Sequence, residues 1–203
     1  MRQIILASAS PRRKELLQMM GLDFIVMPSD FNEWLDDAQS PEDVSKALAE
    51  GKARAVAEKY PEAIVIGSDT IVTVEGKQLA KAATDEAARE MLGSLAGRAH
   101  EVTTGVAVLC LAEDFRYIDA DTAHVVFKPY NTAEVEKYIA TGDYRDKAGA
   151  YGIQSGALPL IDHYEGDIET IIGLPTQLLL KPLEKFGYNK LAVANYSLNV
   201  PFI

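Results

Sequence analysis

The sequence predicts a mixed α/β (α+β) fold, and two observations carry that prediction. Segments with the pattern of strands and of helices share the chain, some strands following one another and others alternating with helices. The 203 residues hold 48% hydrophobic and 25% charged side chains, enough to bury a sizeable core. Because no repeat, low-complexity tract or linker interrupts them, we expect a single domain over residues 1–203.

The expected elements are bounded by capping, proline or glycine signals. Residues 147–156 are glycine-rich and predict a loop, and the tail after Tyr188 has the pattern of weakly structured chain. The other elements, in order, are a strand over 3–7, a helix over about 11–20, a helix from Ser40 towards Lys59, strands over 63–67 and 70–74, a turn at Glu75-Gly76, a helix from Thr84 to Gly93 or Gly97, strands over 102–111 and 121–128, a helix over 132–140, and a helix that opens at Pro175 and ends before Gly187.

The charge of the chain excludes some partners. Its formal net charge is -10, whereas proteins that bind nucleic acids or anionic membranes are usually basic. We therefore expect no nucleic-acid or membrane partner, and an anionic substrate must be held by a local cluster of cations. The single Cys110 can form no intrachain disulfide, which fits a reducing compartment. With no signal-like start and no apolar run of membrane-spanning length, the cytoplasm is the expected location.

The start of the first helix has the features of an anion site. The second helix opens with Ser40–Asp43, a hydroxyl cap and a proline followed by acids that face the positive end of the helix dipole. The first helix has the same cap and proline at Ser10, but Arg12 and Arg13 follow, and each cation there costs a few tenths of a kcal/mol to ~1. A polyphosphate would reverse that cost, because backbone N–H groups, the hydroxyls of Ser8 and Ser10, and two guanidinium groups can cradle it. The alternative is that both arginines point into solvent or pair with distant acids.

A carboxylate inside an apolar run is the second unusual feature. Asp69 interrupts a β-branched segment, and its burial is costly unless cations or hydrogen-bond donors surround it. Its glycine, serine and threonine neighbours predict a strand end or bend that opens onto a cleft, where Asp69 would bind a metal or orient a water. The alternative is an ordinary turn aspartate between two strands. Lys52 lies in the apolar stripe of the second helix, although such a lysine usually extends to the surface.

Oxygen atoms are the only metal ligands that the sequence offers in a useful pattern. The histidines at 100, 124 and 163 have no ligand-like spacing. Glu33 lies in an acidic loop that either binds a metal or is simply solvated, and Lys81 is unremarkable alone. A metal held by oxygen would be magnesium or manganese. No Walker loop, dinucleotide fingerprint or Gly-x-Ser-x-Gly elbow occurs in the chain.

Several motifs in one order resemble the Maf family of nucleotide pyrophosphatases, and the similarity extends from Ile5 to about Leu183. The motifs are Leu6–Leu17 (LASASPRRKELL), Gly51–Ala55 (GKARA), Gly67–Val72 (GSDTIV), Gly97–Val106 (GRAHEVTTGV), Asp146–Gln154 (DKAGAYGIQ), Glu165–Asp167 (EGD) and Gly173–Pro175 (GLP). The resemblance implies an elongated two-lobed fold with a central cleft, similar to the inosine-triphosphate pyrophosphatases. It also implies metal-dependent cleavage between the α- and β-phosphates, and a homodimer.

The resemblance also assigns roles by position. It implies that Ser8, Arg13, Lys52 and Lys81 hold phosphates, and that Glu33 and Asp69 serve the metal and the water. Asp69 is the expected general base or water-orienting group.

The residues after the catalytic aspartate bear on the base that the site prefers. Thr70, together with Arg12, Lys81 and Gln154, resembles the branch of the family that acts on dTTP and UTP. The branch that prefers 7-methyl-GTP typically has a different residue after the aspartate. The Gln154 amide both donates and accepts hydrogen bonds, which suits the imide edge of a pyrimidine.

Three departures from the family pattern stand out. Residues 80–83 read Ala-Lys-Ala-Ala where Gly-Lys-Pro is more usual, and Ala99 replaces a common threonine. Residues 168–170 read Ile-Glu-Thr where Tyr-Ser-Asn is usual. None removes an expected phosphate or metal group, so we expect activity to be tuned rather than abolished.

Two other functions compete with hydrolysis. The first is a non-catalytic, nucleotide-binding regulator of septum formation, a role attached to this family, which would act through a protein partner. The second is nucleotidyl transfer to an acceptor. The set of cations and a buried carboxylate favours catalysis over binding alone.

Overall fold

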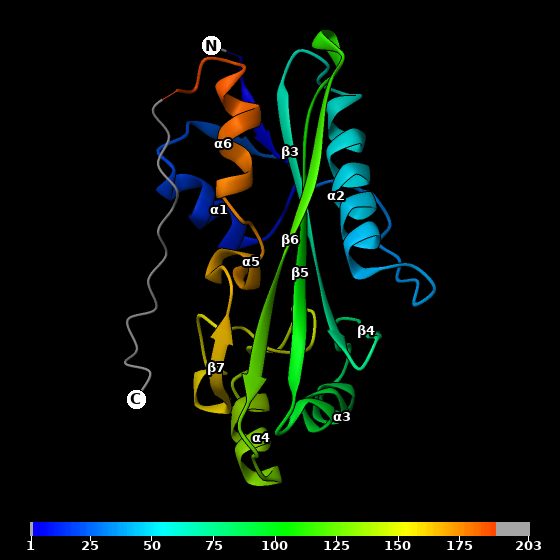
Figure 1. Cartoon of the computed structure of the whole chain (residues 1–203), viewed down its shortest axis with the longest axis vertical. Coiled ribbons are helices and arrows are strands. Elements are labelled where there is room, and N and C mark those ends of the chain that lie inside the picture. Colours follow the sequence, from blue (N-terminus) through cyan, green and yellow to red (C-terminus); the bar gives the residue numbers. More distant parts are fainter. Residues whose placement is uncertain (1, 190–203) are drawn as a thin grey trace.

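The computed structural model describes residues 2–189, which form an elongated molecule around a seven-stranded sheet (Figure 1). The strand order is β2-β1-β3-β5-β6-β7, and β4 pairs with β3 off this path. Strand β1 is parallel to both of its neighbours, and the remaining pairs are antiparallel. The strands are β1 (Ile4–Leu6), β2 (Phe24–Val26), β3 (Ile64–Val74), β4 (Lys77–Leu79), β5 (Ala99–Cys110), β6 (Phe115–Phe127) and β7 (Ile161–Glu165).

Helices cover both faces of the sheet at the end that holds β1 (Figure 1). Side chains alternate across a strand, so Ile4 and Leu6 pack with α1 and α6 on one face, whereas Ile5 packs with α2 on the other. At the opposite end of the molecule lie α3, α4, β4 and β7 (Figure 1). The helices are α1 (Pro11–Met19), α2 (Pro41–Ala57), α3 (Asp85–Leu95), α4 (Thr132–Ile139), α5 (Ile168–Ile172) and α6 (Gln177–Glu184).

Two glycines let α2 lie close to the sheet. A Cβ atom added at Gly67 of β3 would lie 2.3 Å from the carbonyl oxygen of Ala49, and one at Gly105 of β5 would lie 2.3 Å from that of Ser45. No real Cβ atom tolerates such a separation, so only glycine fits at these positions. The close approach brings Lys52 of α2 within bonding distance of Asp69 on β3.

The structure corrects one prediction that matters for the site. The strands expected over 63–67 and 70–74 are a single strand, because the ladder between β3 and β5 is unbroken from Val65 to Thr73. Asp69 therefore lies in mid-strand opposite Gly105. Both the predicted strand end or bend and the alternative of a turn aspartate are wrong. The side chain reaches the cleft because it stands on one face of the sheet.

Most other predicted elements are confirmed, with shifts at their ends. The last helix begins at Gln177, two residues after Pro175, and ends before Gly187 as expected. Strand β6 begins at Phe115 rather than near residue 121. The sequence pattern does not predict β2, β4, β7 or α5, which have three to five residues each. The predicted weak structure of the tail concerns mainly residues 190–203, outside the described part. Within residues 2–189, no helix has the length and apolar character needed to span a bilayer.

Candidate active site

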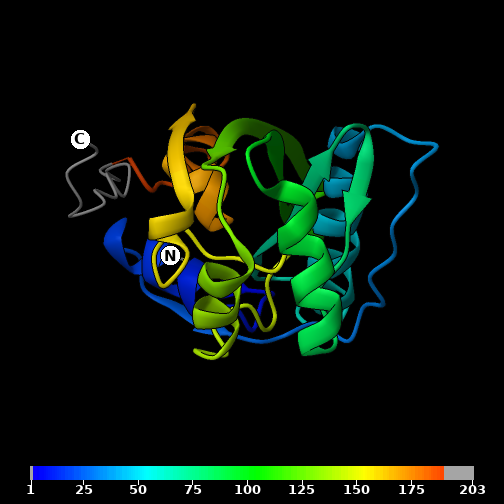
Figure 2. The ribbon, with the colours of Figure 1, turned by 90° about the horizontal axis from the view of Figure 1, so that it is seen from below.

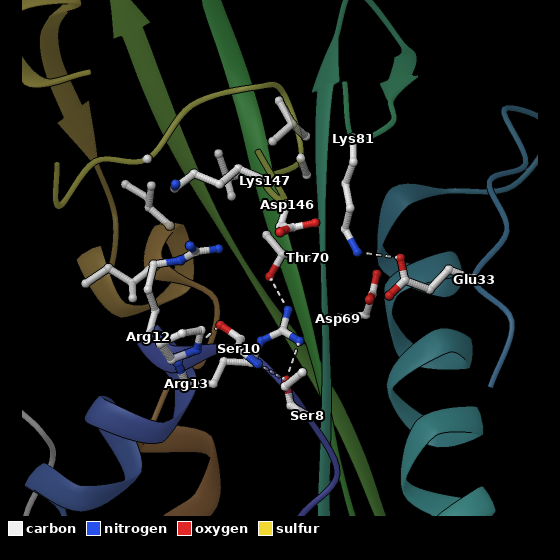
Figure 3. A pocket seen from close by; sticks show the side chains of 18 of the residues that line it. Ser8, Ser10, Arg12, Arg13, Glu33, Asp69, Thr70, Lys81, Asp146 and Lys147 are labelled. Carbon is white, nitrogen blue, oxygen red and sulfur yellow. Dashed lines mark hydrogen bonds and ion pairs between the residues drawn. The ribbon is translucent and has the colours of Figure 1, made fainter. Parts of the chain in front are cut away.

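A cleft of about 430 Å³ opens beside β3 and gathers every predicted site residue. It is lined from one side by the start of α1, from the other by α2 and the segment before it, and above by the loop after α4 (Figure 3). The predicted residues that line it are Ser8, Arg12, Arg13, Glu33, Lys52, Asp69, Thr70, Lys81 and Gln154. The sequence therefore predicts the membership of this cleft, although not its internal contacts.

Asp69 and Lys52 form a buried ion pair on one side of the cleft. Asp69 is 7% exposed and Lys52 is 6% exposed, and the Lys52 ammonium donates to Asp69 Oδ1. A buried charge of either sign is costly alone, so each compensates the other. Lys52 thus does not extend to the surface, because the close approach of α2 to β3 turns it inward.

Glu33 extends this pair into a network of four charges. Its Oε1 accepts from the Lys52 ammonium at 2.7 Å. Its Oε2 accepts from the Lys81 ammonium at 2.8 Å (Figure 3). Burial opposes ionisation of Glu33, but the hydrogen bonds from Lys52 and Lys81 outweigh it and lower the pKa of Glu33 to about 2. Glu33 is therefore a fixed anion at neutral pH.

The segment that carries Glu33 is held from both sides. It runs between β2 and α2 along the outer side of the molecule (Figure 2). The Gln78 side chain of β4 donates to the Asp36 carbonyl at 2.9 Å, and the Gln78 backbone N–H donates to Asp37 Oδ1 at 2.9 Å. The Phe31 ring lies so near Gly51 of α2 that a Cβ there would be 2.3 Å away.

The start of α1 faces the ion-pair network across the cleft (Figure 3). Ser10 caps the helix by accepting from the Arg13 N–H at 3.4 Å, and Ser8 Oγ accepts from the Ser10 N–H at 3.2 Å. The first turn holds no acid to balance its two arginines. Positive charge at the positive end of a helix suits an anionic ligand.

Arg13 is bound to the protein rather than directed into solvent. Its Nε donates to the Gly173 carbonyl at 2.8 Å, its Nη1 to the Ser68 carbonyl at 2.7 Å, and its Nη2 to Thr70 Oγ1 at 3.0 Å. Burial lowers the pKa of Arg13. A guanidinium has five N–H donors, so part of its capacity remains for a ligand.

Arg12 stands in a different electrostatic setting from Arg13. Burial lowers the pKa of Arg12, and the nearby carboxylates of Asp143 and Asp146 oppose that effect. These acids belong to the loop on the far side of the cleft, so Arg12 faces charge of opposite sign across the opening.

Gln154 presents an unusual buried acceptor. Among the described residues, its Oε1 is one of three buried side-chain atoms without a hydrogen-bond partner in the protein. Buried polar atoms are nearly always hydrogen-bonded, and this one belongs to a residue that lines the cleft. A ligand that donates a hydrogen bond would satisfy it.

Sequence reasoning missed several residues of the cleft wall, notably Asp146, Lys147 and Tyr151. All three belong to the glycine-rich loop, whose irregular structure gives no periodic signal. Lys147 is held by Asp143, since its ammonium donates to Asp143 Oδ1 at 2.9 Å. Their presence in the Asp146–Gln154 motif was the one available signal.

The chemistry of the donors fits a hard divalent cation. Within the described residues, no group of three or more His, Cys, Asp or Glu side chains stands ready to hold a metal. Glu33 and Asp69 nevertheless share one neighbour, Lys52, so their carboxylates converge. Magnesium commonly takes only one or two carboxylates and completes its sphere with waters and substrate phosphates.

The chain is similar to known proteins over most of its length. The family model described as Maf-like protein matches residues 3–186. The chain belongs to the Maf-like protein family. A dTTP/UTP pyrophosphatase from Symbiobacterium thermophilum is 44% identical to this Maf-like chain over 188 residues, which is 93% of this chain and 96% of the relative. Another from Dictyoglomus thermophilum is 43% identical over 191 residues, 94% and 99% of the two chains.

One more sequence relative agrees with this assignment. A dTTP/UTP pyrophosphatase from Bacillus cereus (strain ZK / E33L) is 42% identical over 187 residues, 92% of the Maf-like chain and 97% of the relative. Among solved structures, the Staphylococcus aureus Ham1 protein overlaps with 62% of this chain and 72% of its own, at a TM-score of 0.44 and 17% identity. The family assignment rests on the family model and the sequence relatives.

Proposed function

We propose that this Maf-like chain hydrolyses dTTP and UTP to the nucleoside monophosphate and pyrophosphate. One observation carries the proposal: a single cleft joins the arginine-bearing start of α1 to the network of Asp69, Lys52, Glu33 and Lys81. The names of the relatives at 42–44% identity support the reaction and the substrates.

The cations of the cleft hold the triphosphate. Arg12, Ser8 and the backbone N–H groups at the start of α1 bind phosphate oxygens from one side, with the one N–H group of Arg13 that the protein does not use. Lys52 and Lys81 approach from the other side, where they already meet carboxylates. Their charges stabilise the negative charge that develops on the departing pyrophosphate.

Asp69 orients the attacking water. Its Oδ1 bonds to Lys52, and its Oδ2 accepts a hydrogen bond from the water. The water oxygen forms a bond to the α-phosphorus, and the bond between that phosphorus and the α,β-bridging oxygen breaks. Pyrophosphate leaves with the electron pair, and the proton of the water passes to Asp69 and then to solvent.

Magnesium or manganese is the proposed cofactor, with Glu33 and Asp69 as its protein ligands. The support is the oxygen chemistry of these two carboxylates and their convergence on Lys52. When bound, the metal supplies positive charge that neutralises the triphosphate oxygens. We expect activity to disappear when EDTA removes the metal and to return on addition of magnesium.

Gln154 is the proposed contact to the nucleotide base. The buried Gln154 Oε1 accepts from the imide N–H of uracil or thymine, and its amide N–H₂ donates to a base carbonyl. Cytosine lacks that imide N–H, so we expect CTP to be a poorer substrate than UTP.

Incubation of the purified chain with dTTP and magnesium, followed by an assay for pyrophosphate, tests the proposal. We expect equal amounts of pyrophosphate and dTMP from dTTP, and a similar yield from UTP, without any acceptor. Release of orthophosphate instead would contradict the reaction. A chain that binds dTTP but releases nothing would favour the regulatory role in septum formation.

The resemblance to the family supports a homodimer as our proposal for the oligomeric state. The single cysteine, which fits a reducing compartment, supports the cytoplasm as the proposed location. Size-exclusion chromatography with light scattering tests the homodimer, and the expected mass is twice the 22.2 kDa of one chain.

A further inference from the structure

Glu169 is a buried carboxylate that the proposed reaction does not use. It lies in α5, is 2% exposed and does not line the cleft. Its Oε2 accepts from the Thr176 backbone N–H at 3.0 Å and from the Thr176 hydroxyl. A carboxylate is costly to bury, so its presence at this position indicates a role beyond packing.

Glu169 contacts both ends of the turn that follows α5. Its backbone carbonyl accepts from the N–H groups of Gly173 at 2.8 Å and Leu174 at 2.9 Å, while its side chain holds Thr176. Gly173 has a φ of +118°, a conformation that glycine adopts without strain. The main-chain carbonyl of Glu169 therefore holds the start of the turn over residues 173–176, and its side chain holds the end.

That turn presents a carbonyl to the active site. The Gly173 oxygen accepts from Arg13 Nε at 2.8 Å and from Ser68 Oγ at 2.9 Å. A Cβ atom on Gly173 would lie 3.0 Å from Thr70 Oγ1 and 3.4 Å from Arg13 Nε. The turn is thus one of the anchors of the Arg13 guanidinium, together with the Ser68 carbonyl and Thr70.

A second route connects α5 to the same guanidinium. The Thr104 hydroxyl donates to the Thr170 carbonyl at 2.7 Å, which uses its one proton. In the 3.0 Å bond between Thr70 and Thr104, Thr70 must then be the donor. Thr70 Oγ1 in turn accepts from Arg13 Nη2 at 3.0 Å. Both routes begin in α5 and end on different nitrogens of Arg13.

We propose that Glu169 is a positioning residue, which holds the Arg13 guanidinium for the triphosphate through the turn at Gly173. This inference rests on the proposed function for the role of Arg13.

A double-mutant cycle tests the positioning role. We expect Glu169→Ala to lower kcat/KM for dTTP about tenfold, and Glu169→Gln, which keeps an acceptor for Thr176, to recover most of that loss. In an Arg13→Lys background we expect Glu169→Ala to change kcat/KM less than about twofold, because the guanidinium that it positions is gone. A tenfold loss in that background, or a Gln variant as poor as the Ala variant, would overturn the proposal.

Thr176→Val is the milder variant, to be used where Glu169→Ala does not fold. It removes one hydroxyl and should lower kcat/KM about threefold, again without effect in the Arg13→Lys background. Thr103→Val is the matched control, since Thr103 is buried and its hydroxyl bonds to Thr122 at 2.9 Å, away from Arg13. A loss of kcat/KM in the control equal to that of Thr176→Val would also overturn the proposal.

Failure of the proposed function would be separately visible. A wild-type chain that releases no pyrophosphate would contradict the function alone. The coupling would still be measurable as free energies of unfolding in urea, where Thr176→Val and Arg13→Lys should be non-additive. Additive unfolding energies would overturn the positioning role.

Discussion

Asp69 combines burial with charge compensation in one side chain. It stands in mid-strand, and its carboxylate is paired with Lys52, which also bonds to Glu33. Removal of one partner of a buried pair typically costs about 3–5 kcal/mol, because the other charge is left uncompensated. The Lys52 ammonium would keep Glu33 as a counter-charge, which moderates that cost.

Asp69→Asn tests the role of this carboxylate. The amide has nearly the same shape but cannot accept the proton of the water, so we expect turnover of dTTP to fall about 10²–10⁴-fold. Circular dichroism should show an unchanged fold. Rates within threefold of the wild-type value would remove Asp69 from the mechanism.

At the level of residues, the sequence predicted which side chains meet but not how they pair. The embedded Asp69 and the arginines after Ser10 were visible as violations of ordinary patterns. Lys52 was also visible, as a charge in an apolar stripe, but its inward turn was not predicted, because it depends on the distance between α2 and the sheet. The role of Arg13 as a tie to Gly173 depends on a contact across 160 residues, which no local pattern encodes.

At the level of elements, the packing of α2 on β3 and β5 determines the geometry of the cleft. Gly105 lies opposite Asp69 in the ladder and directly under the Ser45 carbonyl. Small residues at such contacts let backbones approach closely, and an added methyl group has no room.

Gly105→Ala tests this packing. The new Cβ would meet backbone atoms, which cannot give way, so α2 must move outward at a cost of about 1–3 kcal/mol or more. We expect Gly105→Ala to lower the free energy of unfolding, and to lower kcat/KM more than a control substitution does, because Lys52 moves with the helix. Gly93→Ala is the control, because a Cβ at Gly93 meets nothing within 4 Å. Equal effects of the two substitutions would contradict the account.

The elements that the sequence failed to predict share one physical property. Strands β2, β4 and β7 and helix α5 have three to five residues, too few for a periodic pattern to develop. Their structure comes from partners elsewhere in the chain, as when β2 pairs with β1 across a connection that contains α1. The long elements, by contrast, carried clear caps and periodicity, and the sequence predicted them.

At the scale of the whole molecule, the charge of the cleft opposes the charge of the protein. The chain carries a net charge of -10, yet the cleft is lined by five cationic and three acidic side chains. An anionic substrate would therefore be attracted by the cations of the cleft, because the field of the whole acidic protein does not attract it.

The prediction of a single domain over 1–203 stays a prediction, and the fold class is confirmed.

His100 links the stability of the molecule to pH. It is 3% exposed, its Nε2 bonds to the Tyr151 hydroxyl at 2.8 Å, and burial lowers the pKa of His100 to about 4. The unfolded chain binds a proton near pH 6.5, so between these values it binds more protons than the folded chain. Stability must then fall as the pH falls.

Urea unfolding of the wild type and of His100→Gln measures this linkage. We expect the wild type to lose about 2 kcal/mol of stability through His100 between pH 7 and pH 5, and the variant to lack that loss. Parallel pH dependences for the two proteins would show that His100 is protonated in the folded state.

Hydrolysis of dTTP in ¹⁸O-labelled water, with mass analysis of both products, tests the central claim most directly. Attack of a water held by Asp69 on the α-phosphorus predicts one ¹⁸O atom in dTMP and none in pyrophosphate. Label in pyrophosphate, or in orthophosphate with dTDP as the other product, would contradict the account.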